Sequence, residues 1–224
     1  MEAKSNPNEI PGISPKKRVL FVVTQSELGG AQRFLCELIS RLDRNKYEIL
    51  AAAGKDGDGE FLGILRNMAV STLSLRFLKR KIGLYSDFRG YLEIGGLIKE
   101  FRPDTVFLSS SKAGVLGSLA ARKFPHPKVI YRIGGWSFNE PMPWLVRRFY
   151  LLAEKCTARF KDIIIVNNRY DFDQAKKLKI RPRQNVELIH NGIDPYKLEI
   201  FGKDEAKIKL FERLPQRQRD FLHA

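Results

Sequence analysis

Two adjacent glycines stand at a junction where proteins often hold phosphate groups. Gly29 and Gly30 follow a short apolar run, residues 19–23, and precede a segment whose apolar residues recur at helical spacing. The run indicates a strand buried on both faces, and the segment predicts an amphipathic helix. Glycines at such a helix start let a ligand approach the backbone, and the amides of the first turn favour an anion. An anion site is therefore predicted here; a tight turn without a ligand has the same sequence.

A second polar group follows a later apolar run. Ser110, Ser111 and Lys112 come directly after a strand predicted at residues 105–108. Two hydroxyls and an ammonium group at a strand end can hydrogen-bond a sugar or neutralise a phosphate. A serine before a helix is also a common N-cap, so the sequence leaves two interpretations for Ser110 and Ser111.

Predicted strands and helices alternate along the chain and must position these residues. The strands are predicted at residues 18–24, 47–53, 70–75, 105–108, 128–133, 163–166 and 186–189. The helices are predicted at residues 31–42, 60–68, 87–101, 113–123, 144–160 and 171–178. This alternation predicts an α/β fold, a Rossmann-like parallel sheet wrapped by helices, with ligands at the carboxyl ends of the strands.

The composition is that of a folded, basic protein. The 224 residues carry a formal net charge of +15, without a disorder signature or a run of about 18 apolar residues that could span a membrane. An acidic partner is expected, and phosphate groups, anionic lipid headgroups and nucleic acid all fit. Residues 76–81 and 144–150 interleave basic and apolar side chains, as in segments that rest on a membrane surface; solvated edges have the same pattern.

Three segments are expected along the chain. Residues 1–16 are polar, carry three prolines and lack the apolar stretch of a secretory signal, which predicts a flexible leader and a cytoplasmic protein. Residues 17–194 form the predicted Rossmann-like domain. Residues 195–224 are charged and helix-prone, as expected of a linker or tail.

The chain lacks the sequence motifs of several classes of enzyme and binding protein. Residues 25–30 do not contain G-x-G-x-x-G, and the second predicted strand does not end in an acidic residue, which argues against a dinucleotide oxidoreductase. No phosphate-loop motif, no His/Cys cluster for a metal and no serine-nucleophile elbow occur. Nucleic acid is the weakest partner hypothesis, because no reader motif accompanies the basic charge. The sequence identifies no catalytic residue.

Three motifs in order resemble those of a known family. They are the glycine pair with Ala31, Gln32 and Arg33, the segment from Ser110 to Gly117, and the segment from His190 to Asp194. Together they resemble the N-terminal domain of family 4 retaining glycosyltransferases with the GT-B fold, over about residues 17–194. Such enzymes build bacterial surface polysaccharides.

The resemblance implies how the residues are used. In that family two Rossmann-like domains face each other, the N-terminal one mainly binding the acceptor and the C-terminal one the nucleotide-sugar donor, a co-substrate that needs no further cofactor or metal. The resemblance implies substrate contacts for Gly29, Gly30, Gln32, Ser110, Ser111 and Lys112. Asn191 belongs to a turn that tolerates positive φ, and His190 is either a cleft residue or a structural histidine. A lipid-linked sugar diphosphate as acceptor would explain both the basic surface and the apolar patches, with peripheral contact at the inner face of the plasma membrane.

The loop at residues 131–140 departs from the family pattern. Many relatives have a histidine that contacts the donor sugar where this chain has Gly134, followed by Gly135. Arg132, Trp136 and Asn139 can instead supply a cation, a stacking platform and an amide, whereas the alternative for Trp136 is plain packing.

A larger departure concerns the donor side. The family's donor signature, two glutamates with seven residues between them, occurs nowhere in the sequence. The chain is therefore expected to be the acceptor-binding half of a glycosyltransferase, with negligible transfer unless a C-terminal donor domain is supplied in cis or in trans. The alternative is a non-catalytic module that recruits an anionic glycan, a lipid headgroup or a membrane surface.

Overall fold

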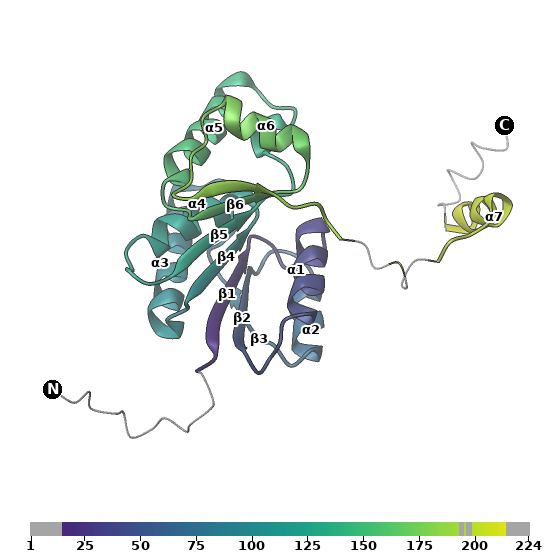
Figure 1. The fold of residues 1–224 in the computed structure, drawn as a ribbon, viewed down its shortest axis with the longest axis horizontal. Coiled ribbons are helices and arrows are strands. Elements are labelled where there is room, and N and C mark those ends of the chain that lie inside the picture. Colours follow the sequence, from purple (N-terminus) through teal and green to yellow (C-terminus); the bar gives the residue numbers. More distant parts are fainter. Residues whose placement is uncertain (1–14, 193–194, 196–198, 214–224) are drawn as a thin grey trace. The chain divides into compact units, whose positions relative to one another are not determined.

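The computed structural model describes residues 15–192, 195 and 199–213 (Figure 1). Contacts divide the chain into two compact units, residues 1–190 and 191–224, each described by itself. In the second unit the described helix is α7 (Lys203–Arg213). Almost all of the expected leader lies outside the described residues, and the expected boundary between residues 194 and 195 adjoins residues that are not described, so both stay predictions.

The first unit is built on a seven-stranded parallel sheet. Its strands are β1 (Lys17–Val23), β2 (Tyr47–Gly54), β3 (Ser71–Leu75), β4 (Thr105–Ser109), β5 (Lys128–Arg132), β6 (Ile163–Val166) and β7 (Asn185–Leu188). The helices are α1 (Gly30–Ser40), α2 (Glu60–Asn67), α3 (Leu84–Phe101), α4 (Ser111–Ala121), α5 (Trp144–Ala158) and α6 (Arg169–Lys177). The predicted Rossmann-like fold is confirmed, with element ends shifted by a few residues at most. The short 3-10 helix η1 (Ser137–Asn139) was not predicted.

The strand order β3-β2-β1-β4-β5-β6-β7 creates a switch in the middle of the sheet. β1 pairs with β2 on one side and with β4 on the other. The chain moves outward from β1 to β3, returns to β4, and then moves outward in the opposite direction. In open sheets of this kind ligands bind in the crevice outside the strand ends at the switch.

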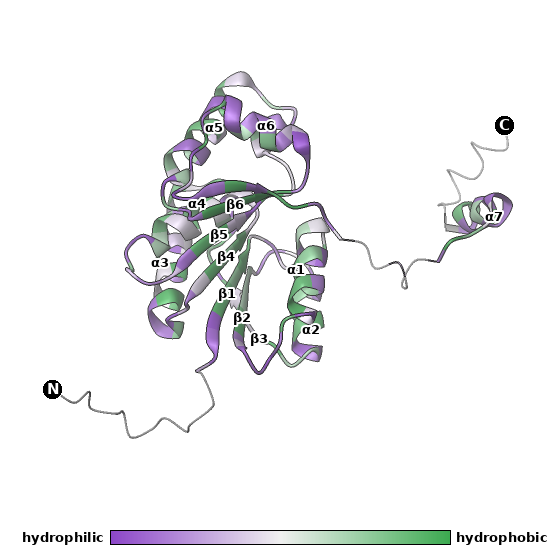
Figure 2. Cartoon of the chain, viewed as in Figure 1, coloured by the Kyte–Doolittle hydropathy of each residue, from purple (hydrophilic) through white to green (hydrophobic). Residues whose placement is uncertain are grey.

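After Lys17 and Arg18, β1 is apolar from residue 19 to residue 23, because helices cover both faces of this part of the sheet (Figure 2). Val19, Phe21 and Val23 pack with α1 and α2 on one face. Leu20 and Val22 belong to the core that α3, α4, α5 and α6 cover on the other face. Figure 1 shows these two helical layers around the sheet. No helix among the described residues is long and apolar enough to cross a membrane.

Helix α4 packs on the sheet more closely than side chains normally allow. A Cβ atom added to Gly114 would lie 2.4 Å from Cε2 of Tyr131, and one added to Gly117 would lie 2.4 Å from Cδ2 of Leu108. Tyr131 and Leu108 belong to β5 and β4, so glycine lets the helix axis approach both strands. The close approach determines where the first residues of α4 lie.

Candidate functional site

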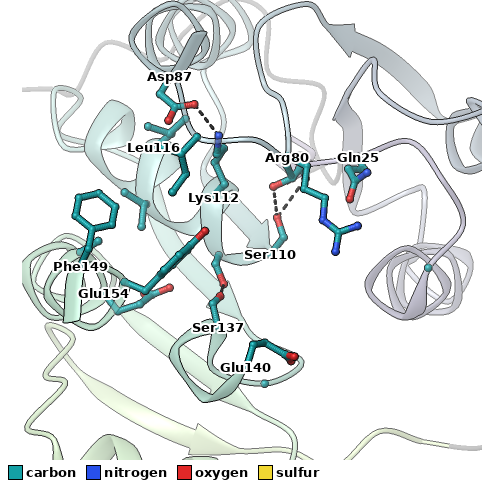
Figure 3. Close-up of a pocket in the computed structure, with 18 of the residues that line it drawn as sticks. Gln25, Arg80, Asp87, Ser110, Lys112, Leu116, Ser137, Glu140, Phe149 and Glu154 are labelled. Atoms are coloured by element: carbon teal, nitrogen blue, oxygen red, sulfur yellow. Dashed lines mark hydrogen bonds and ion pairs between the residues drawn. The ribbon is translucent and has the colours of Figure 1, made fainter. Parts of the chain in front are cut away.

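A cavity of about 680 Å³ opens at the carboxyl ends of β1, β4 and β5, next to the switch point (Figure 3). Most of its polar lining comes from the segments that follow these strands: Thr24, Gln25, Glu27, Gly29, Gln32, Ser110, Ser111, Lys112, Gly135, Ser137 and Glu140. Arg80, Asp87 and Glu154 add charged groups from other elements. Helices α4 and α5 add apolar side chains, among them Val115, Leu116 and Phe149. The volume of the cavity and its mixture of polar and apolar lining residues are typical of a small-molecule binding site.

Ser110 joins the ends of β4 and β1 in a strained conformation. Its φ of 109° and ψ of 150° lie in a region that is essentially restricted to glycine. The hydroxyl accepts a hydrogen bond from the Thr24 amide at 3.2 Å and lies 2.6 Å from the Thr24 hydroxyl. No side-chain hydrogen bond caps α4, so the N-cap interpretation of Ser110 does not hold for its hydroxyl. Strained residues of this type cluster at binding and active sites.

Two substitutions at Ser110 separate strain from hydrogen bonding. Ser110→Ala keeps the positive φ and loses both bonds to Thr24, so we expect the free energy of unfolding to fall by about 1–2 kcal/mol. Ser110→Gly loses the same bonds but relieves the strain, so it should be about 1 kcal/mol more stable than Ser110→Ala. Urea denaturation measures both. A glycine variant less stable than the alanine variant would show that the backbone here is not strained.

Ser111 and Lys112 extend the polar wall. The Ser111 hydroxyl is hydrogen-bonded to the Ser137 hydroxyl, which links α4 to the loop after β5. The Lys112 ammonium donates to the Asp87 carboxylate at 2.7 Å and to the carbonyl oxygen of Lys81. Since an ammonium has three N–H donors, Lys112 retains one for a ligand while its charge is balanced by Asp87.

The glycine turn lies on the same cavity. Gly29 is the N-cap of α1 without a side-chain cap, and a Cβ added to Gly30 would meet no atom within 4 Å. Gln32 is buried and donates its side-chain amide to the Gln25 carbonyl oxygen at 2.8 Å, which holds the turn in place. The Gly29 amide donates to the Glu27 carbonyl oxygen at 3.0 Å, and Gly30 does not belong to the cavity lining, so the anion site expected at this turn stays a prediction.

A buried ionic cluster lies at the floor of the cavity, where the sequence offered no motif. Glu154 of α5 lines the cavity although only 1% exposed. It accepts hydrogen bonds from the Tyr131 hydroxyl and from the fully buried Lys161 ammonium, each at 2.9 Å. Burial lowers the pKa of Lys161, while burial and the Glu154 charge raise the pKa of Tyr131 well above its ordinary value. The carboxylate is therefore held rigidly between two donors.

Comparison with known proteins now decides the family. A family model described as Glycosyltransferase Family 4 matches residues 28–197. The chain belongs to Glycosyltransferase Family 4. The match contains the glycine turn, Ser110 to Lys112 and the loop after β5, and it confirms the resemblance drawn from the motifs.

Two relatives of this family 4 chain show the extent of the likeness. A UDP-Gal:alpha-D-GlcNAc-diphosphoundecaprenol alpha-1,3-galactosyltransferase of Escherichia coli is 27% identical over 203 residues, which are 89% of this chain and 50% of the relative. The structure of Anabaena HepE in complex with UDP and glucose superposes with a TM-score of 0.65 at 18% identity, over 87% of this chain and 50% of that one, and shows the fold. The chain spans about half the length of the relatives it matches.

The family 4 loop after β5 presents two faces. Gly135, with a φ of +154°, Ser137 and Glu140 line the cavity. Trp136 is only 1% exposed, stacks on Phe138 and donates its indole N–H to the Asp171 carbonyl oxygen at 3.0 Å. The expectation that Trp136 offers its ring to a sugar is therefore corrected, because both ring faces are inside the core. The presence of a tryptophan in the sequence does not by itself distinguish a buried ring from one that stacks on a sugar.

The other predicted residues of this loop lie away from the cavity lining. Arg132 is buried, with its guanidinium 4.1 Å from the centre of the Phe34 ring, and a Cβ on Gly134 would lie 3.5 Å from its Nη1 atom. Burial lowers the pKa of Arg132. The Asn139 amide donates to the Gln174 side-chain oxygen at 2.8 Å, so it joins η1 to α6. These three predicted residues do not line the cavity, and their predicted substrate contacts remain predictions.

The motif after β7 also lies outside the cavity lining. His190 is exposed, and its Nδ1 atom lies 3.0 Å from the Asn167 carbonyl oxygen, which favours the structural interpretation of this histidine. Asn191 falls in the second unit. Six of the predicted residues do line the cavity: Gly29, Gln32, Ser110, Ser111, Lys112 and Gly135. Among the described residues, no three His, Cys, Asp or Glu side chains come together as metal ligands.

Proposed function

We propose that this chain is the acceptor-binding half of a glycosyltransferase that moves a sugar from a nucleotide-sugar to a lipid-linked acceptor in bacterial surface polysaccharide synthesis. The name of the Escherichia coli relative gives the acceptor class, a sugar joined through a diphosphate to a polyprenyl chain. A second relative is named as an O-antigen biosynthesis glycosyltransferase, WbnH of Escherichia coli, at 28% identity over 165 residues. We also propose that the transfer retains the configuration at the anomeric carbon of the donor sugar.

The proposal rests on the cavity having one polar side and one largely apolar side. Gln25, Arg80 and Ser110 lie on one side, and Leu116 and Phe149 on the other (Figure 3). Sugar hydroxyls need hydrogen-bond partners, a diphosphate needs cations or amides, and a lipid chain needs apolar contacts. A lipid-linked sugar diphosphate presents all three groups in one molecule, which a purely polar glycan does not.

In the proposed reaction an acceptor hydroxyl oxygen bonds to the anomeric carbon of the donor sugar. The bond from that carbon to the diphosphate oxygen breaks, its electron pair leaves with the nucleoside diphosphate, and the hydroxyl proton is released. The described residues hold the acceptor so that this hydroxyl faces the donor, and such orientation removes much of the entropic barrier. The first turn of α1, which begins at Gly30, is proposed to direct its positive dipole end toward the donor diphosphate, whose developing charge must be stabilised.

The donor is proposed to bind a second domain supplied in cis or in trans, with the nucleotide-sugar as co-substrate and no other cofactor. The proposed location is the cytoplasm, where nucleotide-sugars are used at the inner face of the membrane. This part rests on the family and on the half-length coverage of the relatives.

Binding of a soluble acceptor analogue tests the proposal. The probe is N-acetylglucosamine diphosphate carrying a decyl chain, titrated into the purified chain by calorimetry. The double variant Ser111→Ala/Ser137→Ala removes two hydroxyls that bond each other, so neither is left unpaired; we expect affinity to fall at least about tenfold. Ser40→Ala, an exposed serine on α1, is the matched control and should bind like the wild type. Undetectable binding, or equal affinity in all variants, would refute the assignment.

Transfer is measured separately from binding. Radiolabelled UDP-galactose should give no product with the chain alone, and product when the donor-side half of the Escherichia coli galactosyltransferase is fused after residue 224. Robust transfer by the isolated chain would contradict the division into halves. Analogue binding without transfer by the fusion would instead support a recruitment module.

A further inference from the structure

Most of the large apolar side chains exposed in residues 15–190 lie in two segments, 82–92 and 144–152. In the first segment Leu84 is 93% exposed, and Tyr85 and Phe88 follow it. In the second, Trp144 and Leu145 are each 63% exposed. Single exposed apolar residues are ordinary, but groups of this size mark interaction sites.

The first half of α5 buries almost none of its side chains against its own domain. Every residue from 143 to 149 is exposed, and the first buried residue of the helix is Glu154. Helices gain most of their stability from packing an apolar face, and short unpacked ones are marginal in water. An apolar helix start of this kind is therefore expected to pack against something outside the domain.

Basic residues predominate around these apolar groups, although the exposed Glu140 lines the cavity just before the second segment. The basic residues are Arg76, Lys79, Arg80, Lys81 and Arg89 in the first segment and its approach, with Arg147 and Arg148 in the second. Between residues 76 and 92 the one acidic residue, Asp87, is bonded to Lys112, and residues 141–153 contain none. Aromatic and aliphatic side chains beside lysine and arginine are typical of segments that lie on anionic bilayers.

Both segments border the cavity described above. Arg80 and Ile82, before α3, line it, as do Met142 and Phe149, at the start of α5. Helix α4 packs against both α3 and α5, and the three helices cover the same face of the sheet (Figure 1). The exposed apolar and basic side chains of residues 79–89 and 144–152 therefore flank the cavity mouth; they are called the mouth surface below.

We propose that the mouth surface docks this chain on an anionic lipid bilayer, with the cavity opening toward the headgroups. The apolar side chains enter the boundary between headgroups and acyl chains, and the arginines and lysines bind lipid phosphates. A lipid-linked acceptor then reaches the cavity past Phe149 while its chain stays in the bilayer. This inference deepens the proposed function and rests on it only for that last step.

Vesicle flotation tests the docking with no substrate present. The purified chain is mixed with phosphatidylcholine vesicles that contain or lack phosphatidylglycerol, and the bound fraction is measured. We expect binding to be at least about tenfold stronger on the anionic vesicles. Trp144→Ser/Leu145→Ser and Arg147→Glu/Arg148→Glu should each lower it at least about tenfold, and neither pair lines the cavity.

Matched controls locate the effect on the molecule. Lys17→Glu/Lys128→Glu makes the same charge change at the amino ends of β1 and β5, and Tyr170→Ser removes an exposed ring on α6. Both should bind like the wild type, and circular dichroism checks that every variant is folded. Equal binding to both vesicle types, equal losses in the controls, or self-association through the mouth surface would each overturn the inference. If the wild-type chain binds the acceptor analogue but not the anionic vesicles, the docking inference is overturned and the proposed function stands. If it binds the vesicles but not the analogue, the proposed function is overturned and the docking inference stands.

Discussion

Replacing Lys161 by methionine is expected to lower the free energy of unfolding by about 3–5 kcal/mol, as when one partner of a buried ion pair is removed. The Lys161 ammonium has no exposed surface and lies 2.9 Å from the Glu154 carboxylate and 3.1 Å from the Thr157 hydroxyl. Without it, the buried Glu154 carboxylate keeps the hydrogen bond from the Tyr131 hydroxyl but loses its counter-charge. Guanidinium denaturation of the two proteins measures the difference.

The double variant Lys161→Met/Glu154→Gln should recover most of this loss. The glutamine oxygen still accepts from Tyr131, and no buried charge is left without a counter-charge. The exposed pair between Arg169 and Asp173, 3.1 Å apart, is the control: Arg169→Met should change stability by about 0–1 kcal/mol. If Lys161→Met costs no more than Arg169→Met, the cluster does not act as a buried pair.

Gly114→Ala is expected to destabilise the domain by about 1–3 kcal/mol, the usual cost of overpacking a core. The added Cβ would lie 2.4 Å from the Tyr131 ring, and that ring is fixed by burial and by its bond to Glu154. Helix α4 must shift, and Ser110 to Lys112 at its start would shift with it. Thermal unfolding measures the loss, and weaker binding of the decyl acceptor analogue would report the shift.

The same substitution on α3 is the control for backbone effects. A Cβ at Gly96 meets no atom within 4 Å, so Gly96→Ala should stabilise by up to about 1 kcal/mol, the helix preference of alanine over glycine. Opposite signs at the two positions would show that packing on Tyr131 decides the outcome. A stabilising Gly114→Ala would mean that α4 lies further from β5 than the structure shows.

The fold and one half of the candidate site could be predicted because they depend on local patterns. The apolar runs and helical periodicities indicate alternating strands and helices, and strand ends in a parallel sheet share one edge. That geometry alone brings the Gly29 turn and Ser110 to Lys112 to one cavity, although far apart in the chain. The shortest element, η1, has too few residues for a periodicity and was missed.

The orientation of the residues in the loop after β5 could not be predicted from local patterns. Gly135 and Trp136 are neighbours, yet one lines the cavity and the other packs against Phe138. Which way each residue faces depends on α6, whose Asp171 carbonyl oxygen accepts from the indole. A contact between residues 35 positions apart leaves no periodic signal in the sequence.

By itself, the sequence determined the order of elements, the parallel sheet, the family and the polar groups at two strand ends, since these follow from spacing and motifs. Only the tertiary structure decided that Ser110 has a positive φ, that Glu154 and Lys161 pair at the cavity floor, and that Trp136 is buried. It also brought the two exposed apolar segments to one cavity mouth. Burial and pairing depend on neighbours supplied by distant elements, and packing chooses those neighbours.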